Sequence, residues 1–285
     1  MLDKILFIIP QYIIPKHVLS NLVGILAKTE ISYIKNFIIK SFIKIYGVNM
    51  KEAYTEDIES FSSFNAFFTR RLKSNARSID SDQSSVVSPV DGKISQIGRI
   101  GNSSIIQAKG KKYSLVRFLG GDKSLSDKFK FGLFSTIYLS PKDYHRIHMP
   151  YDGRLQQMIY VPGELFSVNP ITVENIDNLF AKNERLVCIF DTSYGQMAIV
   201  LVGAMIVSGI KVKWENSFEN VKKIKKYNYP TFGKDQIRIK KGEELGRFLL
   251  GSTVVICFTQ NKLSWLNDLV PKSKIKMGQV IGGHE

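Results

Sequence analysis

Residues 246–258 read GRFLLGSTVVICF, and the interpretation of the whole chain starts from this stretch. Apolar and β-branched residues on both sides of its centre predict two short strands, which the pair Gly251-Ser252 separates. A glycine inside a strand pattern usually indicates a bulge or a close approach of two backbones. That is the ordinary structural interpretation.

The same pair also permits a chemical interpretation. Gly251 lacks a Cβ, so a strained backbone costs little there, and its carbonyl is open to attack by the Ser252 hydroxyl. Attack would turn the peptide bond into an ester, and a base could eliminate the ester to leave dehydroalanine at position 252. Hydrolysis would then give a pyruvoyl group, whose ketone is an electrophile that no ordinary side chain supplies. This chemistry requires a base, an orienting acid and a substrate that needs a ketone.

The composition limits the class of protein. The chain has 285 residues, 44% of them hydrophobic, which suffices for one large domain or a core domain with a smaller one. A formal net charge of +15 favours an anionic partner, but no zinc-finger spacing or RNP-type aromatic motif occurs, so we expect no nucleic-acid partner. Cys188 and Cys257 lie in apolar strand-like runs and are expected to be buried thiols.

The first fifty residues are the most apolar part of the chain, yet no run approaches the ~20 residues of a membrane-spanning helix. We also find no signal-peptide cleavage site. Between residues 31 and 46, Ile and Phe recur on one helical face, Lys40 and Lys44 lie opposite, and Lys35 lies at the border. The pattern predicts a helix that either lies in a membrane interface or packs on the main domain with a solvated lysine face.

Further along, the pattern changes from helical to extended. Residues 64–72 predict a short helix, and the polar residues 73–85 predict a linker. From residue 86 onward, short apolar segments alternate with turns. We therefore expect an α+β fold, with a helical amphipathic region over residues 1–72, the linker, and a mainly antiparallel β domain over residues 86–285.

Two of the four histidines, His145 and His148, follow the strand predicted at residues 134–139. At this spacing they could share one face of a helical turn. A metal site would need a third ligand that no signature supplies, so we expect no metal. A general base needs only one histidine and an orienting carboxylate, and Asp91, in an Asp-Gly turn, is either that acid or simply a turn former. Two hydrogen-bonded structural histidines are the alternative.

Taken together, these motifs resemble one known family. The motifs are SPVDGK with Asp91, DYHRIHMP with His145 and His148, the loop PGELFSVN at residues 162–169, Asn183-Glu184-Arg185, and LGST at residues 250–253. Their order and span resemble bacterial phosphatidylserine decarboxylase. A local departure is Val207-Ser208-Gly209, where the family tends to have Gly-Ser in the other order.

The resemblance implies that Asp91, His148 and Ser252 form a triad for self-cleavage, in which His148 takes the serine proton and Asp91 orients the imidazole. Cleavage between Gly251 and Ser252 would give fragments 1–251 and 252–285, which remain together as a heterodimer. The cofactor would be the pyruvoyl group derived from Ser252, without metal or pyridoxal phosphate.

The resemblance further implies that this group forms a Schiff base with phosphatidylserine, releases carbon dioxide and leaves phosphatidylethanolamine. His145 is the expected proton donor to the carbanion. Leu165, Phe166 and Lys109 are expected to contact the substrate, although the loop that contains the first two could instead fold onto the core. Because acyl chains stay in the bilayer, we expect a peripheral protein on the cytoplasmic face of an anionic cell membrane; a homodimer is left open.

Other functions are compatible with the same residues. One is a serine hydrolase that uses Ser252, His148 and Asp91 without self-cleavage, although the Gly-x-Ser-x-Gly elbow is missing. Another is a non-enzymatic β domain that binds a membrane or nucleic acid through its positive charge. A third is a pyruvoyl-dependent decarboxylase for a soluble amino acid, which the basic, apolar N-terminus disfavours.

Overall fold

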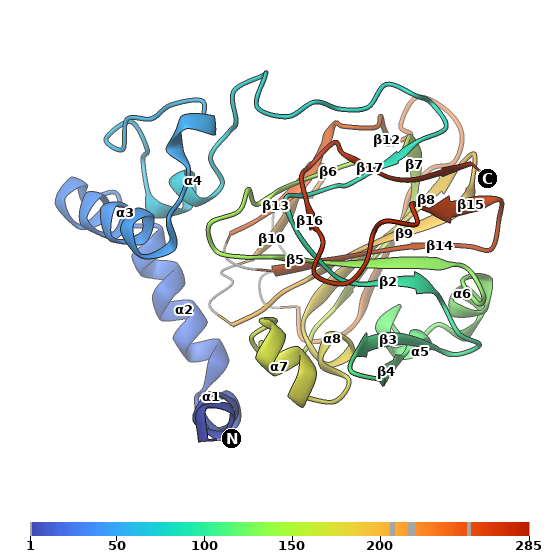
Figure 1. Ribbon diagram of the computed structural model, residues 1–285, viewed down its shortest axis with the longest axis horizontal. Helices are drawn as coiled ribbons and strands as arrows, with labels where there is room; N and C mark the ends of the chain where they lie inside the picture. Colours follow the sequence, from blue (N-terminus) through green and yellow to red (C-terminus); the bar gives the residue numbers. More distant parts are fainter. Residues whose placement is uncertain (1, 206–208, 216–220, 250–251, 285) are drawn as a thin grey trace.

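The computed structural model describes residues 2–205, 209–215, 221–249 and 252–284. A row of helices lies beside a β-rich body (Figure 1), which confirms the expected α+β class. The helices are α1 (Leu2–Ile13), α2 (Lys16–Ala27), α3 (Ser32–Tyr46), the 3₁₀ helix η1 (Met50–Glu52), α4 (Phe64–Phe68), α5 (Leu115–Phe118), α6 (Lys123–Lys128), α7 (Pro170–Asn175) and α8 (Leu179–Lys182).

Helices α1 to α3, here called the helical arm, run along one side of the β-rich body (Figure 1). Gly47 ends α3 in the left-handed conformation that glycine tolerates best. The helix packs through Ile39 and Phe42 on a phenylalanine cluster of α4. Lys35, expected at the border of the polar face, is instead buried, and its Nζ donates to the Glu59 carbonyl at 3.1 Å. None of the described helices is both long and apolar enough to span a bilayer.

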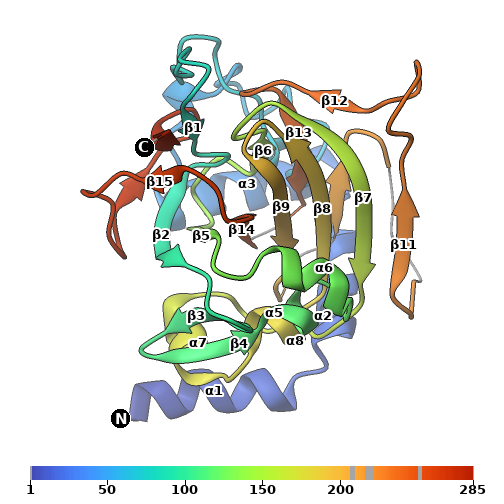
Figure 2. The same cartoon turned by 90° about the vertical axis from the view of Figure 1, so that its right-hand side faces the viewer.

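The strands form four antiparallel sheets within the described ranges. The largest has the order β11-β7-β8-β9-β14-β5-β2-β16, with β12 also paired to β7. Figure 2 shows its curved central strands. The strands are β1 (Val86–Val87), β2 (Gly92–Arg99), β3 (Ser104–Ala108), β4 (Lys111–Ser114), β5 (Leu133–Leu139), β6 (Arg146–His148), β7 (Gly153–Val161), β8 (Arg185–Thr192), β9 (Gly195–Val202), β10 (Ile210–Val212), β11 (Lys225–Asn228), β12 (Arg238–Ile239), β13 (Glu244–Phe248), β14 (Ser252–Phe258), β15 (Leu263–Trp265), β16 (Lys274–Ile275) and β17 (Val280–His284).

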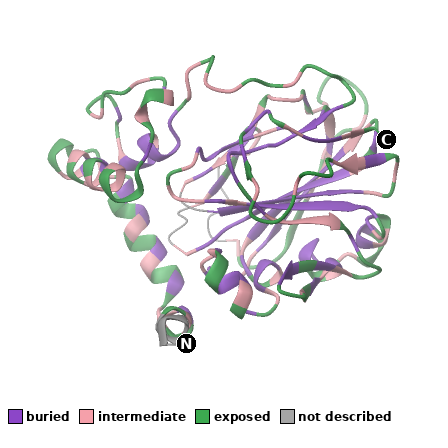
Figure 3. Cartoon of the chain, viewed as in Figure 1, coloured by how far each residue is buried: buried purple, intermediate pink, exposed green. Residues whose placement is uncertain are grey.

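Strand β14 lies in the middle of the largest sheet and is buried along its whole length (Figure 3). Its side chains alternate between two cores, as the period of a strand requires. Val254 and Ile256 face one core, and Val255 and Cys257 face the other. Burial on both faces explains why residues 254–258 of this strand are an unbroken apolar run in the sequence. Both cysteines are buried free thiols, as expected.

A three-stranded sheet of order β10-β13-β6 carries the histidine segment. The hypothesis that the two histidines share a helical turn is wrong, because His148 is the last residue of strand β6 and pairs with Glu244 of β13. A turn over residues 140–143, which contains Pro141, leads the chain into this strand, and Pro150 follows the strand. The segment between the two prolines therefore does not form a helix.

Residues 73–85 contain neither helix nor strand, and β1 begins at Val86. The helices before this segment have their own apolar cluster, which includes Ile39, Phe67 and Phe68. The division into a helical region, a linker and a β domain stays a prediction.

Candidate active site

Ser252 is the first residue of β14 and is fully buried. The register places it opposite Leu139 at the end of β5, directly before the turn that leads to the histidine segment. Its Oγ has no hydrogen-bond partner among the described residues. Gly251, the other half of the predicted cleavage site, lies outside the described residues, as do Val207 and Ser208 of the local departure.

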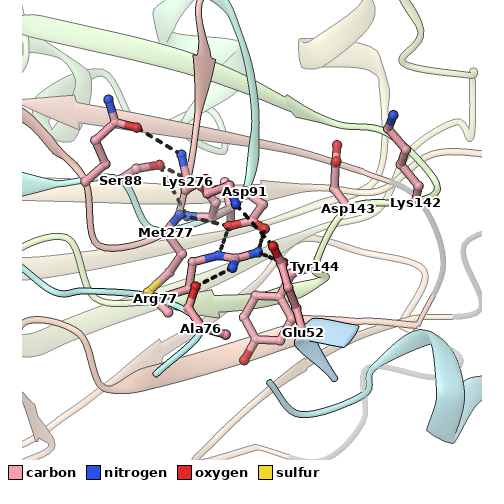
Figure 4. A network of polar contacts seen from close by, with 12 residues as sticks. Glu52, Ala76, Arg77, Ser88, Asp91, Lys142, Asp143, Tyr144, Lys276 and Met277 are labelled. Atoms are coloured by element: carbon pink, nitrogen blue, oxygen red, sulfur yellow. Dashed lines mark hydrogen bonds and ion pairs between the residues drawn. The ribbon is translucent and has the colours of Figure 1, made fainter. Parts of the chain in front are cut away.

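Asp91 lies directly before β2 and is buried, with both carboxylate oxygens engaged (Figure 4). The Arg77 guanidinium donates through Nε to Oδ1 at 2.9 Å and through Nη2 to Oδ2. The backbone N–H of Met277 also donates to Oδ1, at 2.9 Å. Asp91 is therefore held by two segments that are distant in sequence.

His148 is held by a different pair of groups. Its Nδ1 lies 2.7 Å from the Gly242 carbonyl, which can only accept, so the neutral ring carries its proton on Nδ1. Nε2 then accepts from the Tyr144 hydroxyl at 3.0 Å. Burial lowers the pKa of His148, although the Gly242 hydrogen bond and the charges of Glu244 and Asp91 act in the opposite direction.

The backbone brings Asp91 and His148 together, because the His148 N–H donates to the Pro89 carbonyl at 2.9 Å. Among the described residues, no hydrogen bond joins Asp91 to the His148 ring: the carboxylate binds Arg77 and Met277, and the ring binds Tyr144 and Gly242. Asp91 acts on His148 through its charge in this state.

His145 is enclosed on all sides, and its ring centroid lies 4.1 Å from that of Phe68. Its Nδ1 lies 2.8 Å from the Asp143 carbonyl, and its buried Nε2 has no partner within the described part of the chain. Burial lowers the pKa of His145 to about 3, and the nearby Arg70 charge adds to the effect. The His145 carbonyl accepts from the Phe248 N–H, so this histidine lies beside the end of β13 that leads toward Ser252.

The three predicted substrate contacts have partners of their own. Leu165 and Phe166 are buried, and Phe166 packs edge-on against Tyr12 of α1, with the Lys16 Nζ 4.3 Å from its centroid. The loop has thus folded onto the core and the helical arm. Lys109 lies in the β3–β4 turn and forms an ion pair with Glu174 of α7. The roles of these residues in substrate binding stay predictions.

Three residues that hold the site, Arg77, Tyr144 and Gly242, were not predicted from the sequence. Tyr144 lies within the motif DYHRIHMP and could have been considered with the histidines. Arg77 and Gly242 gave no local signal, because their contacts join segments 14 and 94 residues apart.

A family model described as phosphatidylserine decarboxylase matches residues 64–283. The chain belongs to the phosphatidylserine decarboxylase family. A second model, described as PSD, matches residues 6–47. Decarboxylases are lyases, so the family is one of enzymes, and the larger match includes every predicted site residue.

Curated relatives cover nearly the whole chain. The phosphatidylserine decarboxylase proenzyme of Marinobacter nauticus is 50% identical over 284 residues, which cover 99% of this chain and 98% of the relative. That of Pseudomonas fluorescens is 48% identical over 282 residues, with coverage of 99% and 98%. That of Alcanivorax borkumensis is 49% identical over 284 residues, with coverage of 99% and 97%. The phosphatidylserine decarboxylase relatives are thus named as proenzymes.

The geometry predicts unusual titration of both histidines. We expect the neutral His148 ring to carry its proton on Nδ1 and to titrate with a midpoint below 6.5, because burial disfavours its charged form. We expect His145 to stay neutral until about pH 3. Nitrogen-15 chemical shifts of labelled histidine report both properties, and His145→Asn and His148→Asn proteins assign the signals. An Nε2–H tautomer at His148, or a midpoint above 6.5, would contradict the geometry.

Proposed function

We propose that the chain is the precursor of a phosphatidylserine decarboxylase that cleaves its own backbone between Gly251 and Ser252. The observation that carries the proposal is the buried Ser252 hydroxyl without a partner among the described residues, at the first position of a strand paired on both edges. Leaving a buried hydroxyl unpaired is costly, and a catalytic role is a recognised reason for keeping one. The proenzyme names of the relatives support a processed precursor.

In the proposed cleavage, Ser252 Oγ attacks the carbonyl carbon of residue 251, and the peptide C–N bond breaks to give an ester and a free Ser252 amine. His148 takes up the hydroxyl proton at Nε2, because its Nδ1–H is engaged with Gly242, and passes it to the Ser252 nitrogen as the C–N bond breaks. The proton reaches Nε2 either through the Tyr144 hydroxyl or after the Tyr144–His148 hydrogen bond opens. A base then removes the α-hydrogen of residue 252, and the carboxylate of residue 251 leaves. Water converts the remaining dehydroalanine to the pyruvoyl group and ammonia.

Asp91 favours this proton transfer through its charge. Protonation of His148 is opposed by burial, and the Asp91 carboxylate is one of the groups that offset this opposition. The Gly242 carbonyl keeps the ring in the Nδ1–H tautomer throughout. Orientation and charge stabilisation, which one residue was expected to supply, are thus divided between Gly242 and Asp91.

A pyruvoyl group at position 252 fits its surroundings, because its formation removes the buried hydroxyl that has no partner among the described residues. When present, the group supplies a carbonyl that reacts with the substrate amine and accepts the electron pair left by departing carbon dioxide. Phosphatidylserine is the substrate class that the family name and the apolar helical arm favour together.

His145 transfers a proton in the proposed decarboxylation. Its Nδ1–H donates to the Asp143 carbonyl, so the unpaired Nε2 is a proton acceptor in the neutral ring. The substrate amine arrives as an ammonium and must lose a proton before it reacts with a carbonyl. Burial keeps the free ring neutral, so we assign to His145 Nε2 only the delivery of a proton to the carbon that has lost carbon dioxide, at a stage when the bound substrate has changed its surroundings.

The helical arm supports peripheral binding to an anionic membrane. Apolar side chains exposed on it include Ile25 (70% exposed), Tyr33 (84%) and Phe37 (65%). The chain carries a net charge of +15, which attracts it to anionic lipid. Such a surface gives the enzyme access to a headgroup whose acyl chains stay in the bilayer, on the cytoplasmic face.

The Ser252→Ala protein should remain a single chain without decarboxylase activity, because it lacks the attacking hydroxyl. Denaturing electrophoresis and intact mass measure cleavage, and borohydride reduction in the presence of phosphatidylserine detects the ketone in the smaller fragment. Ser135→Ala is the matched control, because Ser135 is another buried serine without a described partner, on the neighbouring strand β5. It should mature normally. An uncleaved wild-type chain that hydrolyses esters would instead establish the serine hydrolase.

The two histidines should separate the two reactions. His148→Ala should block cleavage, because it removes the proposed acceptor of the serine proton. His145→Ala should still mature at least in part, while decarboxylation per mature chain falls by roughly 10²- to 10⁴-fold, the usual contribution of a general acid or base. Timed electrophoresis measures the first step and release of labelled carbon dioxide measures the second. Equal and complete loss of cleavage in both variants would contradict this division.

Membrane binding should depend on the exposed apolar residues of the helical arm. Replacing Tyr33 and Phe37 together by serine should weaken binding to vesicles rich in phosphatidylserine at least about tenfold, because both side chains would otherwise be buried in lipid. Vesicle sedimentation measures the binding. Phe232→Ser is the matched control, since Phe232 is also 84% exposed but lies outside the arm. Equal binding of the double variant and the wild type would exclude this surface.

A further inference from the structure

Arg77 comes from the segment that the sequence presents as a plain polar linker, yet its side chain is only 5% exposed. Its guanidinium donates to both oxygens of Asp91, to Glu52 Oε2 at 2.6 Å and to the Ala76 carbonyl at 2.6 Å. Figure 4 shows these contacts converging on one side chain. Every nitrogen of the guanidinium therefore has an acceptor.

Burial opposes the charge of Arg77, but its hydrogen bonds to Asp91 and Glu52 overcome this and raise its pKa. Bidentate binding of a carboxylate by arginine is among the strongest and most directional polar contacts in proteins. Removing one partner of such a buried pair leaves the other charge uncompensated. The position of the Asp91 carboxylate thus depends on Arg77 more than on any other side chain that contacts it.

Glu52 and Lys276 complete a cluster of two anions and two cations. Lys276 Nζ donates to Glu52 Oε1 at 3.2 Å, and the next residue, Met277, supplies the backbone N–H that binds Asp91. Burial raises the pKa of Glu52, but the contacts with Arg77 and Lys276 outweigh this and lower it. The cluster joins η1, the linker, the start of β2 and the C-terminal segment.

We propose that Arg77 is the positioning residue of the self-cleavage reaction, because it fixes the Asp91 carboxylate beside His148, where its charge stabilises the protonated imidazole. This rests on the proposed function, in which Asp91 assists His148. With both oxygens held by Arg77, the carboxylate keeps one orientation, and its effect on the His148 ring in this arrangement is that of a nearby charge. Lysine cannot replace Arg77, because an ammonium lacks the planar fork that binds both oxygens.

The test measures the rate of self-cleavage after synthesis of the full chain, with folding checked by circular dichroism. Arg77→Ala should slow cleavage by roughly thirty- to a hundredfold, as expected for loss of a charged, two-pronged hydrogen bond. Guanidinium ion at tens of millimolar should restore much of the rate, because it fits the space between Asp91 and Glu52. Arg77→Lys should remain slow and should not respond to guanidinium.

Two further variants distinguish a positioning role of Arg77 from a role only in holding the fold together. Glu52→Gln removes the other ion-pair partner of Arg77 and leaves the contact with Asp91, so its cleavage rate should stay within about threefold of wild type. Arg154→Ala removes an arginine that binds Asp191 and the Thr231 carbonyl in another part of the fold. It should cleave normally and show no guanidinium effect.

The outcomes are distinct. The positioning proposal is wrong if Arg77→Ala folds and cleaves at the wild-type rate. It is also wrong if Glu52→Gln is as slow as Arg77→Ala, because Arg77 would then only hold segments of the fold together. If Arg77→Ala is slow but guanidinium has no effect, the positioning proposal is also overturned. If the wild-type chain itself does not cleave, the proposed function fails instead.

Discussion

The pairing of β14 with β9 on one edge and β5 on the other is the constraint on which the rest of the molecule depends. It fixes Ser252 opposite Leu139 and buries every residue of the strand. On the other side of the undescribed pair 250–251, Phe248 donates to the His145 carbonyl and Leu249 to that of Gly209. The described chain is therefore anchored up to Leu249 and again from Ser252 onward. The ladders on β14 also explain how a fragment beginning at residue 252 would remain bound after cleavage, because they do not involve that bond.

The charge cluster around Asp91 places a second constraint on the same region. Its members come from η1, the linker, the start of β2 and the C-terminal segment, so the surroundings of Asp91 are complete only when all four have assembled. Contacts between segments that are far apart in sequence form late and cooperatively in folding. A precursor that relies on this cluster would cleave after folding and not during synthesis, which keeps the smaller fragment from separating before it is part of the sheet.

The sequence predicted the parts of the fold that depend on local pattern. The apolar run after Ser252 indicated a buried strand, and the 3.6-residue period before Gly47 indicated α3. The conformation of the His145–His148 segment was not recognised, because a spacing of three residues fits a helical turn or a short strand equally well until the partner strand β13 is known. The orienting groups of the site were missed for a related reason. Arg77 and Gly242 act through contacts with remote segments, and no local pattern encodes those contacts.

The two histidines are held in the same way at Nδ1 but have different surroundings at Nε2. A main-chain carbonyl, that of Asp143 or that of Gly242, receives the Nδ1–H of each ring, so both neutral rings present Nε2 as an acceptor. Main-chain carbonyls are fixed by the fold and do not titrate, which makes the tautomer independent of pH over the range in which the ring is neutral.

The two histidines differ in the group that faces Nε2. His148 meets the Tyr144 hydroxyl, whose pKa burial raises to about 12, so a neutral proton relay is always in place there. Nε2 of His145 has no described partner and is enclosed, which suits a site that meets its proton only when a substrate brings one. The resemblance implied a division between cleavage and decarboxylation, and the different surroundings of Nε2 give that proposed division a physical basis.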